Sequence, residues 1–284
     1  MTEAGGIGKH AGGDISWLRQ IGLNMRGTLA TLVRSPRPAG RRLSWPSHRR
    51  LALGTALAVA AVFLAMIALD AWSIGFARRL PAWLVAAFGH LTDLGLSGWF
   101  LWPTGLMLLA LAVADTPAQS RLVRQTMAAL AVRIGFLFLA VAVPGLFVTV
   151  VKRLIGRARP WLENTDVWAY HPFGWQAAFA SLPSGHATTA FSALVAIGAL
   201  WPRARAAMWI YAVFIAASRV VVNAHFPSDV IAGAIVGSVG ALLVRNWFAR
   251  RRLAFAVGAD GGVRSLPGPR WRHIKAVAGR LLSA

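Results

Sequence analysis

The chain has 284 residues, of which 57% are hydrophobic and only 14% are charged, yet 30 Lys and Arg against 9 Asp and Glu residues give a net charge of +21. An ordinary soluble domain carries about 25% charged residues, and a disordered basic protein has low hydrophobicity, so both classes fit poorly, whereas a membrane protein fits both numbers. The chain has no cysteine, which excludes disulfides, thiolate nucleophiles and Cys-ligated metal sites.

Residues 1–50 form a basic tail ahead of the first apolar run. The tail holds nine Lys and Arg residues but only two acids, Glu3 and Asp14. The run 51–69 that follows contains nineteen residues without a charge, enough to cross a hydrocarbon core of about 30 Å at about 1.5 Å per residue. A signal peptide has a shorter apolar core nearer the first methionine, so we expect an uncleaved span.

Five further apolar runs follow, and flanking aromatic residues lengthen the shorter ones. They cover 99–114, 134–151, 187–201, 206–222 and 230–244. The sequence therefore predicts an all-α, polytopic membrane protein, with a six-transmembrane-helix bundle over 51–248 between basic tails at 1–50 and 249–284. Between spans one and two, Arg78, Arg79 and Pro81 precede the apolar run 83–88. This pattern predicts a short interfacial helix, with a plain connecting loop as the alternative.

The Lys and Arg residues divide unevenly between the two sides of such a bundle. An even number of spans places both chain ends on one side, and 23 of the 30 Lys and Arg residues then lie on that side. The positive-inside rule makes this side cytoplasmic. Five of the seven remaining cations lie at the outer ends of the third and fifth spans, where the rule disfavours them: Lys152, Arg153, Arg157, Arg159 and Arg219.

Three motifs fall at this outer face. Lys152 begins a cationic segment that leaves the third span and ends at Arg159 and the helix-breaking Pro160. The tetrapeptide Pro-Ser-Gly-His at 183–186 directly precedes the apolar part of the fourth span. The third motif joins the fifth span to the sixth and consists of Ser218, Arg219, His225 and Asp229.

The first two motifs suit the binding of a phosphate without a metal. Lys152, Arg159 and Arg219 can neutralise a phosphate and the charge that its oxygens carry in the transition state. Ser184 and Gly185 precede a helix, where free backbone N–H groups and the helix dipole favour an anion, and glycine lets the phosphate approach the backbone. The sequence therefore predicts a phosphate-binding cradle at the outer face.

Two histidines supply groups that can react at this cradle. His225 and Asp229 are four residues apart, close enough for the carboxylate to hold one imidazole nitrogen while the other nitrogen faces phosphorus. His186 is a second acid or base, able to protonate the leaving oxygen and later to activate water. Arg153 and Arg157 either contact the substrate directly or serve only to raise the local potential or to bind lipid headgroups.

The three motifs together resemble the signature of the type-2 phosphatidic acid phosphatase superfamily: Lys-x6-Arg-Pro, Pro-Ser-Gly-His and Ser-Arg-x5-His-x3-Asp, with every specified position matched. The resemblance covers roughly residues 50–248 and is to bacterial integral-membrane members. It implies a six-span helical bundle, a phosphohistidine intermediate, no metal and no cofactor. It also implies that His225 is the nucleophile, Asp229 its orienting partner and His186 the general acid. The residues that it implies for binding the phosphoryl group are Lys152, Arg159, Ser184, Gly185 and Arg219.

The expected function is that of a membrane-embedded lipid phosphatase acting on a phosphate monoester or pyrophosphate. Phosphatidate, phosphatidylglycerol phosphate, undecaprenyl pyrophosphate and lipid A phosphate all stay open as substrates. A phosphotransferase that moves the phosphoryl group to a hydroxyl acceptor would use the same motifs and is an alternative. A non-catalytic lipid-binding protein is a third interpretation, although a binder has no need of two suitably spaced histidines.

The expected partners are the lipid phosphate and the bilayer. We expect both tails to be solvated basic arms, and they fit anionic membrane better than nucleic acid, because apolar spans lie between them. We expect a protein of the bacterial cytoplasmic (inner) membrane, with both termini cytoplasmic and the active site at the periplasmic face. Gly233 and Gly237 form a small-xxx-small pattern in the sixth span, which we expect to serve helix packing within the chain rather than a dimer contact. The sequence leaves the oligomeric state open.

Overall fold

The computed structural model describes residues 19–20, 22–27, 30, 35, 43–114, 120–162 and 166–282. Its longer helices are α2 (His48–Ala68), α5 (Gly98–Ala114), α6 (Arg121–Ile155), α7 (Gly185–Leu200), α8 (Arg205–Val221) and α9 (Pro227–Arg250). The shorter elements are α3 (Asp70–Arg78), α4 (Ala82–Asp93), α10 (Trp271–Leu282), the 3-10 helices η1 (Ala177–Phe179) and η2 (Pro202–Ala204), and the strands β1 (Phe255–Val257) and β2 (Val263–Ser265). The described chain is thus mostly helical, as its apolar runs predict.

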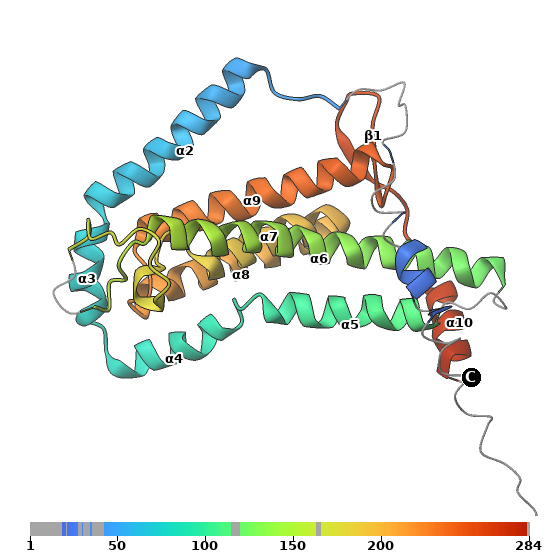
Figure 1. The fold of residues 1–284 in the computed structure, drawn as a ribbon, viewed down its shortest axis with the longest axis horizontal. Helices are drawn as coiled ribbons and strands as arrows, with labels where there is room; N and C mark the ends of the chain where they lie inside the picture. Colours follow the sequence, from blue (N-terminus) through green and yellow to red (C-terminus); the bar gives the residue numbers. More distant parts are fainter. Residues whose placement is uncertain are drawn as a thin grey trace, which may run out of the picture.

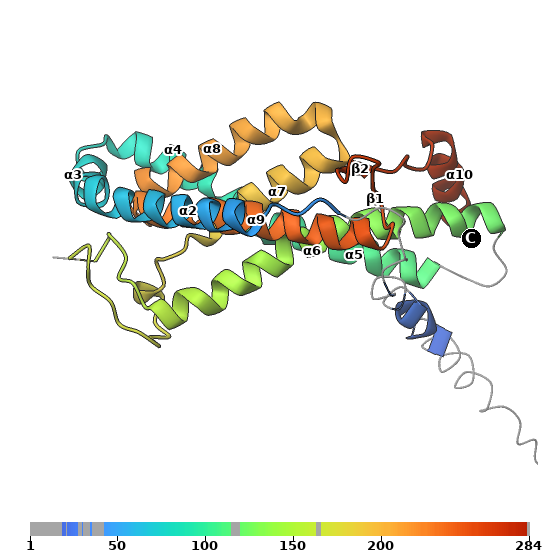
Figure 2. The same cartoon turned by 90° about the horizontal axis from the view of Figure 1, so that it is seen from above.

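Helix α7 lies inside a bundle formed with α5, α6, α8 and α9 (Figures 1 and 2). Helix α2 meets α9 near α3 and diverges from it towards its own N-terminal end (Figure 1). Nine of the sixteen residues of α7 are buried, whereas α5 buries none. Large apolar side chains such as Leu57 and Phe63 on α2 and Leu106 on α5 are more than half exposed. A surface of this kind is unfavourable in water and suits contact with lipid.

Five helical segments are long and apolar enough to cross a membrane: His48–Ala68, Ala82–Ala114, Arg121–Ile155, Pro202–Val221 and Pro227–Arg250. Each of them contains most or all of one expected span. The remaining expected span corresponds to α7, whose sixteen residues reach about 24 Å. The helices are those of an integral membrane protein, while the count of six spans stays a prediction.

The segment 71–98 contains two helices rather than the single one expected. Helix α4 begins directly after Pro81, where the sequence predicts a helix, but α3 was not foreseen. Helix α3 lies across one end of the bundle, and α4 leads from it towards α5 (Figure 1). The hydroxyl of Tyr211 on α8 donates to the carbonyl oxygen of Leu94 at 2.9 Å, which ties the turn between α4 and α5 to the bundle. An interfacial position for either helix stays a prediction.

Close packing between α7 and α9 positions the two helix ends that carry the second and third motifs. A Cβ added to Gly233 would clash with the carbonyl oxygen of Ser184, and one added to Gly237 would clash with that of Thr188. The Ser192 hydroxyl also donates to the carbonyl of Gly237 at 3.1 Å. The expectation that this glycine pattern serves packing within the chain is therefore confirmed.

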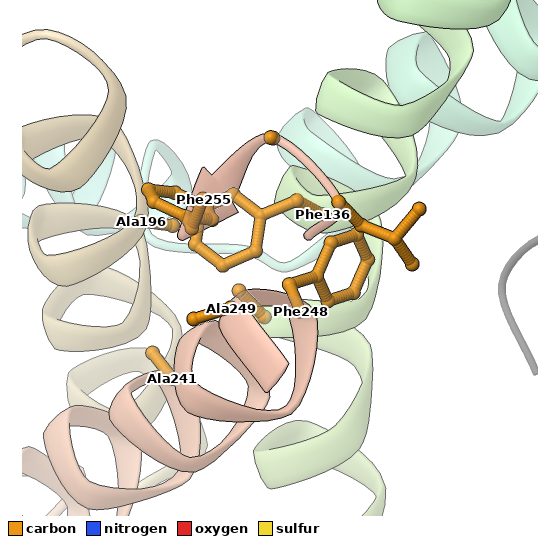
Figure 3. Close-up of a cluster of buried hydrophobic side chains, with 9 residues drawn as sticks. Phe136, Ala196, Ala241, Phe248, Ala249 and Phe255 are labelled. Atoms are coloured by element: carbon orange, nitrogen blue, oxygen red, sulfur yellow. The ribbon is translucent and has the colours of Figure 1, made fainter. Parts of the chain in front are cut away.

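The end of the chain folds back onto the bundle instead of forming the solvated basic arm that its charges had indicated. Phe255 on β1 is 1% exposed and packs edge-on against Phe136, 4.7 Å between ring centroids, beside Phe248 (Figure 3). Apolar burial of this kind stabilises the fold-back, while Arg250, Arg252 and Arg264 stay exposed. Most of the predicted tail 1–50 lies outside the described residues, but Ser44 N donates to Gly261 O at 3.1 Å, so the two tails meet.

Candidate active site

The three motifs come together at the end of the bundle opposite the C-terminus (Figure 1). The segment that follows α6, the start of α7 and the turn between α8 and α9 are joined by backbone hydrogen bonds. Ser184 N donates to Asp229 O at 2.9 Å, and Ser181 N donates to Arg157 O at 3.1 Å. Backbone contacts therefore fix the spacing between motifs that are far apart in the sequence.

His225 is 3% exposed and its Nδ1 atom faces a carboxylate and a hydroxyl. The Oδ2 atom of Asp229 lies 3.6 Å from Nδ1, and the hydroxyl of Ser181 lies 3.4 Å from it. The same Oδ2 accepts hydrogen bonds from Ser181 Oγ at 2.5 Å and from the backbone N–H of Phe226 at 3.0 Å. A neutral ring that carries its proton on Nδ1 therefore keeps the lone pair of Nε2 for another partner.

Burial keeps the His225 ring neutral near pH 7. It lowers the pKa of His225 to about 4, and the positive charges of Arg159 and Arg219 lower it further, although Asp229 acts in the opposite direction. An imidazole with a depressed pKa loses its proton well below neutral pH, so the uncharged and nucleophilic form is the resting form.

The protonation of His225 can be measured directly in the free protein. We expect the ring to stay neutral, with Nδ1 protonated, as the pH is lowered from 8 to 5, and to protonate only around pH 4. Nitrogen NMR of protein labelled in its histidine rings would follow this, with the His225→Ala variant identifying the signal. Protonation with a midpoint near the ordinary value of about 6.5 would contradict the expected burial effect.

The start of α7 provides the predicted oxyanion cradle. Ser184 is fully buried, and its hydroxyl accepts from the backbone N–H of Ala187 at 3.5 Å, which caps the helix. A Cβ added to Gly185 would meet nothing within 4 Å, so open space lies next to this first turn. Backbone N–H groups at a helix start and the positive end of its dipole favour an anion in such a space.

His186 lies on the first turn of α7, against the turn between α4 and α5. A Cβ added to Gly95 would come within 3.1 Å of the His186 ring carbon Cδ2. The charges of Arg219, Arg159 and Lys152 all act on His186, and so does His225. The structure thus brings both histidines and the three cations of the predicted cradle into one neighbourhood.

A hydroxyl on α4 binds the guanidinium of Arg219, and the Nε donor of the same group stays available for a ligand. Its side chain is 7% exposed, and Nη1 donates to the hydroxyl of Thr92 at 2.5 Å, which Ser218 Oγ also approaches at 2.9 Å. The buried Nε of Arg219 has no hydrogen-bond partner within the part of the chain that the structure describes. A buried donor of this kind is costly unless a ligand satisfies it, and a phosphate oxygen is a suitable acceptor.

Arg157 is paired with two carboxylates inside the protein, an arrangement that the sequence did not indicate. Its side chain is buried and forms ion pairs with Asp70 Oδ2 and Asp229 Oδ1, each at 2.7 Å. Burial alone would lower the pKa of the guanidinium, but Asp229 and Asp70 raise it overall, so the group stays charged. Removing one partner from a buried pair generally costs about 3–5 kcal/mol of stability.

Asp70 is the functional candidate that the sequence reasoning missed. It is fully buried at the start of α3, directly after the first span. The available signal was a single acid at the end of a long uncharged run, because an ionisable group in that position is usually retained for a partner. The partner, 87 residues away in the chain, has no sequence signature of its own.

Comparisons with known proteins place this chain among bacterial membrane phosphatases. A family model described as the PAP2 superfamily matches residues 133–253. The lipid A 1-phosphatase of Rhizobium johnstonii is 37% identical over 71% of this chain and 82% of its own length. Phosphatidylglycerophosphatase B of Escherichia coli is 34% identical over 31% of this chain and 37% of its own length. The crystal structure of Aquifex aeolicus LpxE aligns with 62% of this chain and 93% of its own, at 22% identity and a TM-score of 0.44.

Proposed function

Because the chain belongs to the PAP2 superfamily and is a lipid phosphatase of the bacterial membrane, we propose that it cleaves its substrate through a phosphohistidine on His225. The observation that carries this proposal is the arrangement around that ring. Asp229 and Ser181 occupy the Nδ1 side, and cations of the first and third motifs act on the same site. The Nε2 lone pair is thereby reserved for phosphorus.

The reaction has two steps. In the first, Nε2 of His225 attacks phosphorus in line with the ester oxygen, the N–P bond forms, the P–O bond breaks, and His186 donates a proton to the departing oxygen. In the second, His186 accepts a proton from a water molecule, whose oxygen attacks phosphorus and breaks the N–P bond. Free phosphate leaves and both histidines return to their first states.

Positive charge at the cradle stabilises both transition states. Lys152 on the last turn of α6, Arg159 and Arg219 would neutralise the phosphoryl oxygens, and the first turn of α7 would add backbone N–H donors. The exchange of one proton at His186 is sufficient for each step. The proposed reaction therefore involves no metal ion.

The orientation of the molecule follows from the charges at its two ends. The tails meet at one end of the bundle and the three motifs lie at the other (Figure 1). We place the tails in the cytoplasm by the positive-inside rule, α7 across the membrane as the fourth of six spans, and the catalytic part at 51–248. The site would then lie at the depth of lipid headgroups on the periplasmic face.

The relatives favour one substrate class among those that the motifs allow. Among the relatives compared by sequence, lipid A 1-phosphatases match over most of their length, whereas phosphatidylglycerophosphatase B matches over 37% of its length. We propose that the 1-phosphate of lipid A is the preferred substrate. Specificity of this kind arises from contacts outside the reacting group, here the segment 71–98 and the loop between α6 and α7.

Phosphate release from a panel of lipids in mixed micelles tests the preference. We expect kcat/KM for lipid A to exceed that for phosphatidylglycerol phosphate, phosphatidate and undecaprenyl pyrophosphate by about tenfold or more, which corresponds to about 1.4 kcal/mol. The His225→Ala variant supplies the background rate. Equal or faster release from one of the other lipids would overturn the assignment of substrate without affecting the proposed chemistry.

A further inference from the structure

Two buried charges next to the site have no part in the steps described above. We propose that Asp70 and Arg157 form a positioning pair, which fixes the first turn of α9 and thereby orients Asp229 and His225. The inference rests on the proposed function, because it assigns a role to residues that act through the nucleophile. Neither residue belongs to the specified positions of the three motifs.

Asp70 caps α9 although it belongs to another helix. Its Oδ1 accepts from the backbone N–H of Ser228 at 3.1 Å, and its Oδ2 accepts from the Ser228 hydroxyl at 2.6 Å. Ser228 is the second residue of α9, so the carboxylate lies at the positive end of the helix dipole and satisfies a donor that the helix leaves free. The start of α9 is therefore held from α3.

Arg157 holds the same turn from a second side. Its Nη1 donates to Ser228 Oγ and to Asp229 Oδ1, both at 2.7 Å. Its Nη2 donates to Asp70 Oδ2 at 2.7 Å and to the carbonyl oxygen of Val167 at 3.0 Å. The guanidinium carbon also lies 4.3 Å from the centre of the Phe226 ring, a cation–π contact. Arg157 thus contacts three of the four residues that follow His225.

Because of these contacts, the two carboxylate oxygens of Asp229 have different partners. Oδ1 is bound by Arg157, and Oδ2 is thereby turned towards Ser181, Phe226 N and the His225 ring. Without Arg157, two buried carboxylates would share the surroundings of Ser228 with no positive charge between them. Asp229 would turn away or take up a proton, and either change would release the His225 ring from its Nδ1-protonated form.

Kinetics on the full-length protein in detergent test the pair. We expect Arg157→Met and Asp70→Asn to lower kcat about 10- to 100-fold while KM changes less than about twofold, because neither side chain touches substrate. Arg157→Lys keeps the charge but not the two-sided contact, so kcat should recover only in part. Ring nitrogen NMR should show that His225 has lost its preference for the Nδ1-protonated form.

A matched control is available at the other end of the molecule. Asp260 and Arg264 form an exposed ion pair, 3.1 Å between Oδ2 and Nη2, so Asp260→Asn and Arg264→Met remove the same groups far from the site. Both variants should keep the parental kcat and the parental His225 signal.

The possible outcomes separate the positioning role from a purely structural one. A structural role would lower the amount of folded protein but leave kcat per folded molecule and the His225 ring form unchanged, and that result would overturn the proposal. The milder Arg157→Lys and Asp70→Asn variants decide the matter if Arg157→Met does not fold. Failure of the proposed function would show elsewhere, as turnover retained in His225→Ala.

Discussion

Replacing His225 by alanine should lower kcat by about 10⁴-fold or more, because it removes the atom that forms the bond to phosphorus. Binding of lipid should be almost unaffected, since Lys152, Arg159 and Arg219 would remain. The loss should therefore appear in kcat and not in KM. Phosphate release from lipid A micelles over a range of substrate concentrations separates the two constants.

The matched control for this variant is His90→Ala. His90 is exposed on α4, the helix whose Thr92 contacts Arg219. No step of the proposed reaction uses His90. This variant should keep the parental kcat. Turnover by His225→Ala within tenfold of the parent, in protein that unfolds at the parental temperature, would show that another group attacks phosphorus.

Replacing Arg219 should have the second largest effect, with kcat lower by about 10³-fold in Arg219→Ala. Arginines that neutralise a transferring phosphoryl group contribute about 10³- to 10⁵-fold in comparable sites. Arg219 meets the requirements for this role, because Thr92 holds Nη1 while the buried Nε has no partner among the described residues. Arg219→Lys should recover little of the loss, because an ammonium group cannot contact Thr92 and a phosphate oxygen in one plane.

Arg203→Ala is the control for the arginine variants. Arg203 is exposed in η2, next to the other end of α8, so its loss removes the same charge at a distance from the site. Stopped-flow or steady-state phosphate release would compare the variants. A parental kcat in Arg219→Lys would indicate that only the charge matters, and a parental kcat in Arg219→Ala would remove the residue from the reaction.

The site could be predicted from the sequence because the motifs place suitable residue types at one face of the expected bundle. Cations at the outer ends of spans contradict the topological charge bias, and two histidines in fixed spacing to Ser184 and Asp229 point to one reaction. The structure brings these residues to one end of the bundle.

The ion pairs of Arg157 could not be predicted, because the sequence shows that the residue is charged but not where its side chain points. Arg157 and Arg159 are two residues apart in one basic segment, yet Arg157 is fully buried between carboxylates and Arg159 is partly buried near Ala180. The deciding contacts come from Asp70 and Asp229, which are 87 and 72 residues away. Long-range ion pairs of this kind leave no periodic pattern in a single sequence.

The end of the chain was misread for a related reason. Its arginines indicated a solvated arm, whereas Phe255 decides the outcome by packing against Phe136. A strand of three residues, such as β1, is too short to give a recognisable alternation of apolar and polar positions. Helix α7 shows the opposite case, since the apolar run 187–201 was recognised although it falls short of the usual length of a span.

The most direct test of the phosphohistidine is to trap it and locate it. Protein carrying His186→Ala lacks the acid of the first step and the base that activates water in the second. It is incubated with lipid A labelled at its phosphate for long enough to complete the slowed first step, and is then digested with trypsin. Cleavage after Arg219 and Arg245 releases residues 220–245, in which His225 is the single histidine. We predict an acid-labile, alkali-stable phosphate on this peptide, and none in the His186→Ala/His225→Ala double variant. Turnover without label on this peptide, or label on another residue, would contradict the proposed reaction.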